Sequence, residues 1–466
     1  MRKRISLPAL DNLRGSDTGK AAGLAGAMIV NNVIALGSSI VFARLINDYG
    51  ALAALVSYLL ILTVAGQAMQ VATAREGVLG HLGVGPELLR TLKRWGRSLG
   101  LFTLLATIIS VLLRQPIADL VGVKHDSWAA AAGIPAACMY LEVSILRGAL
   151  QGVGDYKSVG LSLIGEQGSR LIGGAVLAVI GLGVGGAYLG SLLSYVAMSA
   201  YCIYRLHARL AAPAHAPAAA DGHAPAPAAG LASAPGRAGA RAAVGLWQHV
   251  QGAWVAIAGL AVIQLLQNLD LITAKHQFSR NVASSYAVAA VAAKVLIWVA
   301  MGAGFYLVPE TSRRRAAGQD TRVVLLRVLG IVGACAIPCL LIYAFAAHPL
   351  LAVVFGKKRA IASSSLLPLG AAFTVLAATY LAVQYMLALK RVGFLAVIAV
   401  VAVIEPVLLL QAPRHPAAFA SVVLGVQVIG ALLAYGMALR PDRRRPVVPA
   451  SEPPVEAEAI TPEPVA

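Results

Sequence analysis

Two charged side chains stand inside an otherwise apolar stretch of the sequence. In "LIGEQGSRLIGG" (163–174), Glu166 and Arg170 lie one helical turn apart. An ionised side chain at the middle of a bilayer costs about 2.5–3.5 kcal/mol on insertion scales, whereas an i,i+4 ion pair returns only about 0.3–0.5 kcal/mol. The pair is therefore expected to face protein or a wet cavity rather than lipid. Two roles stay open: a polar cavity wall, or a buried bridge that joins this helix to a neighbour.

Amide and charged side chains recur at helical spacing in other apolar runs. Such stripes can line a central polar path, or they can bond one helix to the next, which is the commoner role of a single amide. The candidate path residues are Asn31, Asn32, Gln67, Gln70, Glu166, Arg170, Gln264, Gln267, Asp270 and Lys294. Asp270 and Lys294 lie on adjacent predicted helices, so they are also candidates for an ion pair.

Four intramembrane carboxyl groups are candidates for ion coupling. They are Glu142, Glu166, Asp270 and Glu405. Each is suited to bind a coupling proton or cation, to be held neutral by burial, or to pair with a structural cation. The sequence leaves these three roles open.

Long apolar helices must position these groups. The chain has 466 residues, of which 59% are hydrophobic and 12% charged, about half the charged fraction of a soluble domain. Twelve apolar runs approach the roughly 20 residues that span a bilayer. The first is too long for a signal-peptide core and lacks a cleavage site, so we interpret it as a retained span. The predicted fold is all-α, a polytopic membrane protein of about twelve transmembrane helices.

The net charge of +18 follows from topology. Most of the 38 Lys and Arg residues fall in segments that are cytoplasmic if the N-terminus is inside, as the positive-inside rule requires. No nucleic-acid partner is needed to explain the charge. We expect a multi-pass protein of the plasma (inner) membrane with both termini in the cytoplasm.

The chain divides into two halves around a linker. We expect a cytoplasmic N-terminus (1–20), an N-terminal six-helix bundle (21–204), an Ala/Pro-rich cytoplasmic linker (205–249), a C-terminal six-helix bundle (250–439) and a disordered cytoplasmic tail (440–466). A shift of 233 residues places "KSVG" (157–160) on "KRVG" (390–393) without a gap. Two copies with an even number of spans share one orientation, which predicts a pseudo-twofold axis along the membrane normal.

One predicted loop has an amphipathic pattern. In "PELLRTLKRWGR" (86–97), leucines and Trp95 share one helical face and the basic residues share the other. A helix that begins at the proline and lies on the inner leaflet fits this pattern. An ordinary basic cytoplasmic loop fits equally well.

Several chemistries have no motif in this sequence. No G-x-x-x-x-G-K-[ST] phosphate loop and no metal-spaced Cys/His set occurs. The four cysteines are interpreted as buried small hydrophobes. The predicted external loops are too short for a catalytic domain. A transporter without cofactor or metal is therefore favoured over an enzyme.

Three stretches resemble the bacterial polysaccharide and oligosaccharide flippases, in the superfamily that also contains multidrug extruders and lipid II flippases. "VFARLINDYGALAALVSYLLIL" (41–62) is similar to that family's Ala-Arg-Leu, turn and Tyr-Gly signature, although its turn is shorter and lacks Gly-Pro. "RGALQGVGDYKSVGLSLIGEQGSRLIGG" (147–174) resembles the hairpin of spans four and five. "NLDLITAKHQFS" (268–279) places Asp270 at the usual acidic position of span seven.

The resemblance implies a V-shaped pair of bundles that moves a lipid-linked saccharide from the cytoplasmic to the outer leaflet by alternating access. It implies that Arg170 and Lys294 attract the pyrophosphate and that the amides bond sugar hydroxyls. Membrane lipids, a coupling proton or cation and glycan-assembly enzymes are the expected partners. The alternatives are a cation-coupled multidrug extruder or lipid II flippase of the same superfamily, a non-transporting membrane scaffold, and a sugar-transferring enzyme.

Overall fold

The fold is all-α within the residues that the structure, a computed structural model, describes (17–83, 85–211, 246–389 and 391–439). Most of the predicted N-terminus and linker, and all of the predicted tail, lie outside these residues. The N-half comprises α2 (Asp17–Leu45), α3 (Tyr49–Leu62), α4 (Val64–Val78), α5 (Pro86–Leu112), α6 (Arg114–Val121), α7 (Ser127–Gly152), α8 (Tyr156–Leu177) and α9 (Gly183–Ala211). The C-half comprises α10 (Leu246–Gln277), α11 (Arg280–Ala316), α12 (Arg322–Phe355), α13 (Leu366–Ala388), α14 (Phe394–Gln411) and α15 (Pro416–Ala438).

The chain is a polytopic membrane protein. Eleven segments of the described chain are long and apolar enough to cross a membrane, and the longest, Tyr156–Leu210, contains both α8 and α9. The helices α3 and α4 form one crossing that continues through Thr63. Outer faces carry exposed aliphatic and aromatic side chains, such as Leu104 and Ile108 on α5 and Phe345 on α12. In water such faces would be an aggregation hazard, whereas in lipid they are solvated.

Helix ends are set by short polar side chains. The Asp48 carboxylate accepts a hydrogen bond from the Ala51 amide at 3.0 Å and caps α3. Asp155 caps α8 in the same way through the Ser158 amide, and it also accepts a hydrogen bond from the Ser158 hydroxyl at 2.8 Å. Burial alone would raise the pKa of Asp155, but the Ser158 hydrogen bonds and the charges of Arg209 and Arg205 outweigh burial and lower it.

Small residues let helices approach closely. A Cβ atom built at Gly190 of α9 would lie 2.6 Å from the Gly174 backbone of α8, and one built at Gly152 of α7 would lie 2.9 Å from Gly77 of α4. Such close packing holds transmembrane helices together, because in lipid no hydrophobic effect drives one helix against another. These contacts fix which faces of α4, α7, α8 and α9 point into the N-half.

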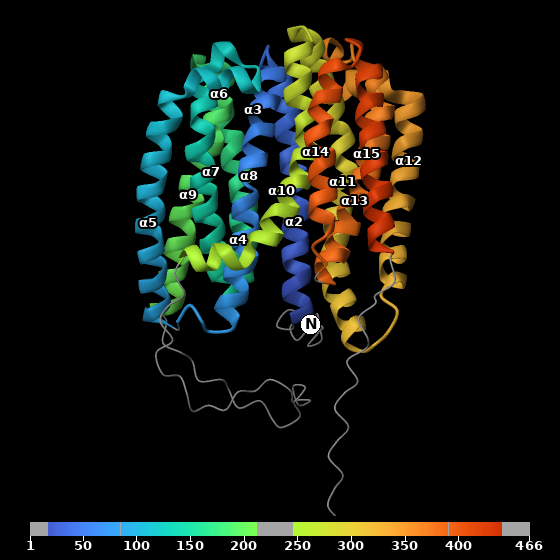
Figure 1. The fold of residues 1–466 in the computed structure, drawn as a ribbon. Helices are drawn as coiled ribbons and strands as arrows, with labels where there is room; N and C mark the ends of the chain where they lie inside the picture. Colours follow the sequence, from blue (N-terminus) through green and yellow to red (C-terminus); the bar gives the residue numbers. More distant parts are fainter. Residues whose placement is uncertain (1–16, 84, 212–245, 390, 440–466) are drawn as a thin grey trace, which may run out of the picture.

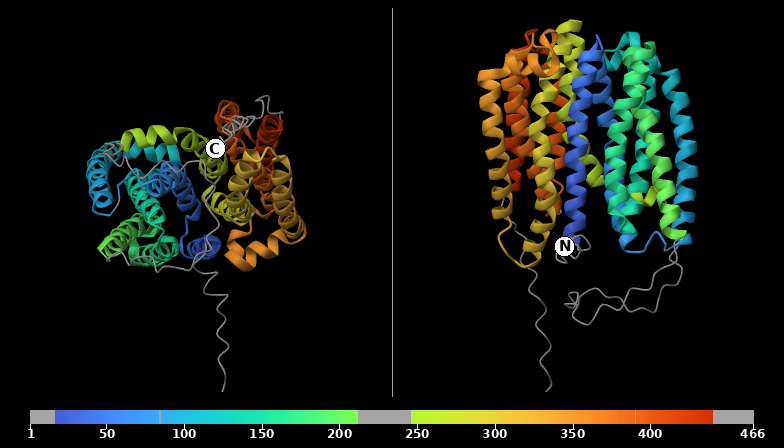
Figure 2. Two further views of the ribbon diagram at one scale, coloured as in Figure 1. Left: turned by 90° about the horizontal axis from the view of Figure 1, so that it is seen from below. Right: turned by 180° about the vertical axis from the view of Figure 1, so that it is seen from behind.

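The halves lie side by side with α2, α10 and α11 between them (Figures 1 and 2). The helix α10 packs against α3 and α4 of the N-half as well as α14 of the C-half, while α11 packs against α2 and α3. One end of the molecule, the Asp48 end, carries the turns before α3 and α11, and the opposite end, the Asp155 end, carries the turn before α8.

Two sequence interpretations need correction. The amphipathic stretch 86–97 is the first part of α5, and its apolar face (Leu88, Leu92 and Trp95) is buried in the N-half rather than laid on a leaflet. The helix does begin at Pro86, as predicted. Of the cysteines, Cys138 and Cys202 are buried but Cys335 is exposed on α12, because that side of α12 belongs to the outer surface.

Candidate functional site

The N-half contains a buried cluster of charges on α7, α8 and α9. The Arg147 Nη1 lies 2.8 Å from Glu166 Oε2, and the Arg170 Nη2 lies 3.7 Å from Glu166 Oε1. Arg147 also donates to the Ser162 hydroxyl and to its carbonyl at 2.8 and 2.9 Å. These residues, with Tyr195, are called the N-half charge cluster. They join three helices.

The two arginines of this cluster are not equivalent. Arg147 is completely buried, with its guanidinium occupied by Glu166 and Ser162. The Arg170 side chain is 14% exposed and donates to the Tyr195 hydroxyl at 2.7 Å, while its Nε has no partner among the described residues. Arg147 thus neutralises Glu166 from inside the bundle, and Arg170 retains an unsatisfied donor at the edge of the cluster.

Sequence reasoning missed Arg147. The fourth apolar run of the sequence (128–147) ends at Arg147, whereas α7 continues to Gly152 and Arg147 is buried. The apolar residues that follow it, Ala149 and Leu150, are also buried. They were the one feature of the sequence that indicated a buried Arg147. The open choice between cavity wall and bridge is resolved for one contact: Glu166 bridges α8 to α7.

A second buried polar group lies in the C-half. The Lys294 Nζ donates to Asn268 Oδ1 at 3.1 Å and sits 5.5 Å from the Phe373 ring centroid. The Tyr286 hydroxyl donates to Asp270 Oδ2 at 3.3 Å. The Gln427 Nε2 donates to Glu405 Oε1 at 3.2 Å. These side chains from α10, α11, α14 and α15, together called the C-half polar cluster, are all buried: Asn268, Asp270, Tyr286, Lys294, Glu405 and Gln427.

The candidate Asp270–Lys294 ion pair does not form within 4.0 Å in the described part of the chain. Lys294 instead donates to Asn268, the residue that follows the candidate path residue Gln267. The Asp270 Oδ1 and Glu405 Oε2 atoms are buried without a partner among the described residues. An unsatisfied ionised oxygen in an apolar interior costs far more than a neutral one, so this geometry suits groups that carry a proton.

The remaining predicted path residues lie in several places. Asn31 and Asn32 are half-buried on α2 and bond each other at 3.4 Å. Gln67 and Gln70 are half-buried on α4. Gln264 and Gln267 are buried on α10, where Gln264 reaches the Leu60 carbonyl of the N-half at 3.5 Å. The structure therefore groups the charges into one cluster per half rather than into one continuous stripe.

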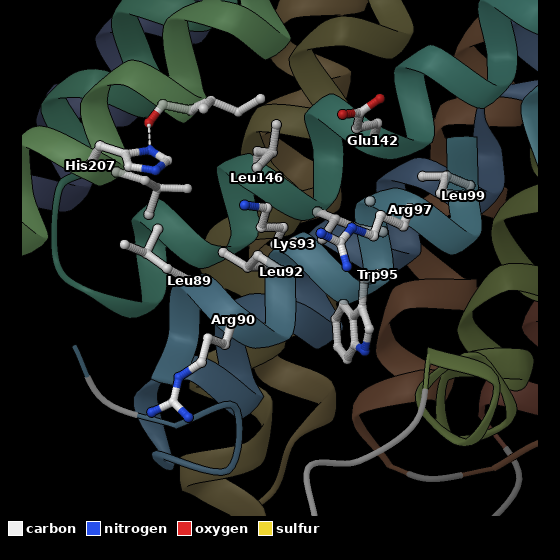
Figure 3. A pocket seen from close by; sticks show the side chains of 14 residues that line it. Leu89, Arg90, Leu92, Lys93, Trp95, Arg97, Leu99, Glu142, Leu146 and His207 are labelled. Carbon is white, nitrogen blue, oxygen red and sulfur yellow. Dashed lines mark hydrogen bonds between the residues drawn. The ribbon is translucent and has the colours of Figure 1, made fainter. Parts of the chain in front are cut away.

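Glu142 belongs to neither cluster. It lines a cavity of about 670 Å³ between α5, α7 and α9 (Figure 3). A second cavity of about 350 Å³ lies at the Asp48 end and is lined by Asp48, His125 and Lys275 among others. The described residues contain no group of three or more His, Cys, Asp or Glu side chains suited to a metal ion.

Arginines join the two halves at the Asp48 end. The Arg44 guanidinium, at the end of α2, donates to the Val353 and Val354 carbonyls of α12, each at 2.8 Å. Arg359, just after α12, donates back to the carbonyls of Ala43, Ile46 and Asn47. Each arginine thus covers the negative C-terminal end of the helix in the other half.

A salt bridge reinforces this contact. The Lys275 Nζ of α10 lies 2.8 Å from Asp48 Oδ1, and Arg280 Nε lies 3.4 Å from Asp48 Oδ2. The Gly50 amide donates to the Ser284 hydroxyl at 3.0 Å. Arg44, Arg359, Asp48 and Lys275 are called the clasp. At the Asp155 end, by contrast, Arg205 bonds within the N-half to Asp155, and Arg322 bonds within the C-half to Leu439.

No family model and no curated protein sequence matches this chain. Solved structures do. The chain is similar to the lipid II flippase MurJ in an inward closed conformation (TM-score 0.66, 14% identity, covering 89% of this chain and 87% of that one). It is also similar to a multidrug resistance MATE family transporter of the MOP superfamily, both inward-facing (0.61, 13%, 90% and 97%) and outward-facing (0.56, 14%, 93% and 96%). The chain therefore has the fold of the MOP-superfamily transporters.

Proposed function

We propose that this protein is a flippase that moves a lipid-linked oligosaccharide or polysaccharide precursor from the cytoplasmic to the outer leaflet by alternating access. The clasp is the observation that carries the proposal. It joins the halves at the Asp48 end, where the predicted topology places the outside, while the arginines Arg205 and Arg322 at the Asp155 end bond within their own halves. Such an arrangement suits a state closed to the outside. The higher TM-score to the inward-facing than to the outward-facing MATE structure supports the same state.

The two clusters supply the chemistry that such a substrate needs. A pyrophosphate-linked saccharide carries negative charge, and arginine and lysine bind phosphate through charge-assisted hydrogen bonds. Arg170 has an unsatisfied Nε and a partly exposed side chain, and Lys294 is bonded to a neutral amide rather than to a carboxylate. We assign both as phosphate-attracting groups of the N-half and the C-half respectively, with Asn31, Asn32, Gln67, Gln70, Gln264 and Gln267 as the polar groups for sugar hydroxyls.

We further propose that Asp270 and Glu405 carry a coupling proton. Both are fully buried, and each has one oxygen that meets no partner in the described part of the chain. Glu166 is less suited because two arginines neutralise it, and Glu142 lies in the cavity of α5, α7 and α9, apart from both clusters. Release of a proton from a C-half carboxyl would change the charge of the cluster by one unit, which can bias the packing of α10 against α14.

The test is a sidedness assay in proteoliposomes that contain a fluorescent undecaprenyl-pyrophosphate oligosaccharide. Wild-type protein should make the labelled saccharide accessible to a membrane-impermeant quencher from the opposite side. Arg170→Gln and Lys294→Gln should lower the rate at least tenfold while the thermal unfolding temperature stays within a few degrees of wild type.

Two outcomes would count against the proposal. Unchanged flipping by both variants would remove the assigned phosphate groups from the mechanism. Absence of flipping by wild type, together with extrusion of cationic dyes by the same vesicles, would favour the multidrug extruder.

A further inference from the structure

The cavity between α5, α7 and α9 has a two-part lining. Its interior is apolar, with Leu92, Leu99, Leu146 and Leu206 all buried in the wall. Its α5 side carries Arg90, Lys93 and Arg97, one helical turn or less apart. In Figure 3, Lys93 lies beside Leu92 and Leu146, whereas the Arg90 side chain extends away from them. The volume of about 670 Å³ lies within the range of small-molecule sites.

The cavity lies away from the interface between the halves. The helix α5 packs against α6, α7 and α9, and it forms the edge of the molecule farthest from α12 (Figure 1). Along the rest of α5, Leu101, Leu104, Leu105 and Ile108 are exposed on the lipid-facing surface. A ligand that enters from the side must therefore come from the bilayer.

The basic side chains of the rim form no close ion pair among the described residues. Within the described residues, neither Lys93 nor Arg97 has a carboxylate within 4.0 Å, and Arg90 approaches Glu87 only at 3.9 Å with both side chains largely exposed. Three cations over a buried apolar groove match one class of molecule, with a negative head and an acyl chain. Near a membrane surface each such cation contributes attraction to anionic lipid.

We infer that this groove is a binding site for an anionic phospholipid of the leaflet at the Asp155 end. Its phosphate lies at Lys93, with Arg90 about one turn before it and Arg97 about one turn after it on α5, and one acyl chain lies along Leu92, Leu146 and Leu206. The site is separate from the proposed transport path, and the inference stands whether or not the protein is a flippase.

Glu142 is the one acidic side chain among the lining residues. It lies ten residues before the end of α7 at Gly152, or about 15 Å along the helix. By the same measure Arg97 lies eleven residues, about 16 Å, from the start of α5 at Pro86, so Glu142 is level with Arg97 and deeper than Lys93 and Arg90. Its carboxyl is therefore about one turn deeper than a phosphate held at Lys93, and Glu142→Gln should preserve lipid binding.

The experiment uses purified full-length protein in detergent with added lipid. Phosphatidylglycerol should raise the unfolding temperature and should remain bound in native mass spectrometry, whereas phosphatidylcholine with the same chains should do neither. Arg90→Gln, Lys93→Gln and Arg97→Gln combined should weaken the apparent affinity about a hundredfold, at roughly fivefold for each cation. Arg94→Gln, on the same helix but outside the lining, is the matched control and should bind as wild type does.

Steric variants separate a groove from a charged surface. Gly96 lines the cavity, whereas Gly100, about one turn further along α5, does not. A Cβ atom built at either glycine has no other atom within 4 Å. Gly96→Phe should abolish retention of phosphatidylglycerol, and Gly100→Phe should not. If Gly96→Phe does not fold, Ile203→Phe, at the 40% exposed lip on α9, blocks the same groove.

Three results would overturn the inference. Equal stabilisation by phosphatidylcholine would show that the negative head group is not recognised. Equal stabilisation by glycerophosphate alone would show a free-anion site without a chain. Wild-type binding by a folded groove-filling variant would show attraction to surface charge only.

Discussion

Arginine 147 shows how a membrane protein keeps a buried charge. Its guanidinium meets the Glu166 carboxylate at 2.8 Å and two oxygens of Ser162, so most of its donors are satisfied without water. A pair of this kind adds little net stability over an apolar pair. Its function is geometric, because it sets the rotation of α8 relative to α7 and so the direction in which Arg170 points.

Arg147→Ala should destabilise the protein by about 3–5 kcal/mol, since it leaves Glu166 buried without its main partner. Unfolding in detergent, followed by fluorescence, measures the loss. Arg209→Ala is the control: that arginine is 56% exposed and pairs with Asp155 at 3.5 Å, so the change should stay within about 1 kcal/mol. A similar effect of both variants would mean that burial of the pair is irrelevant.

Asp270 and Glu405 make the second residue-scale prediction. An amide is isosteric with the protonated carboxyl, so Asp270→Asn and Glu405→Gln should leave folding almost unchanged. Each should abolish the stimulation of transport by an imposed pH gradient, because an amide does not titrate. Initial rates with and without the gradient provide the measurement. Retention of full stimulation by both variants would exclude these carboxyls as carriers.

At the scale of helices, small residues decide the packing. The α8–α9 contact brings Gly174 and Gly190 together so closely that a Cβ at Gly190 would meet backbone at 2.6 Å. The same two helices carry Glu166, Arg170 and Tyr195, so the depth of this contact places the N-half charge cluster. Helix propensity plays a minor part, since glycine is a poor helix former in water.

Gly190→Ala should therefore lower stability by about 1–3 kcal/mol, through overpacking against a backbone that cannot yield. Gly425→Ala is the matched control, because Gly425 is an exposed helical glycine of α15 with open space at its Cβ. That variant should be neutral or slightly stabilised. The measurement is the thermal unfolding temperature of both variants in one detergent. An equal change in both would contradict the close-contact argument.

At the scale of the molecule, the clasp joins the two halves at one end, where the proposed alternating access requires them to separate in every cycle. Its contacts are charge-assisted hydrogen bonds at helix ends, each worth about 1.5–3 kcal/mol. They are strong enough to favour the state in which the halves are joined at the Asp48 end. They are few enough that binding of substrate or of a coupling ion can break them. The same contacts in the interior of the interface would have blocked the path.

A covalent lock at this end should stop transport. Asp48→Cys combined with Lys275→Cys, joined through two disulfides by a short bis-methanethiosulfonate in a chain without its four native cysteines, should reduce flipping to background, and a reductant that cleaves the disulfides should restore it. The two single-cysteine variants treated alike are the controls. Full activity after complete crosslinking would mean that the halves do not part here.

The sequence alone determined the class of the fold. Apolar run lengths and the distribution of Lys and Arg are local properties that add along the chain, so the all-α polytopic fold and the α5 start at Pro86 were predictable. The polar positions in the spans were visible for the same reason, because a Glu166 or an Asp270 in an apolar run needs no structure to be noticed.

Only the tertiary structure decided which partner each polar group takes. Glu166 meets Arg147 from another helix, Lys294 meets Asn268 rather than Asp270, and Arg44 reaches Val353 in the opposite half. Pairing depends on the rotation and depth of one helix against another. Rotation and depth are both set by the shape of packed surfaces, such as the contact of Gly174 with Gly190. They cannot be predicted from the periodicity of a single helix.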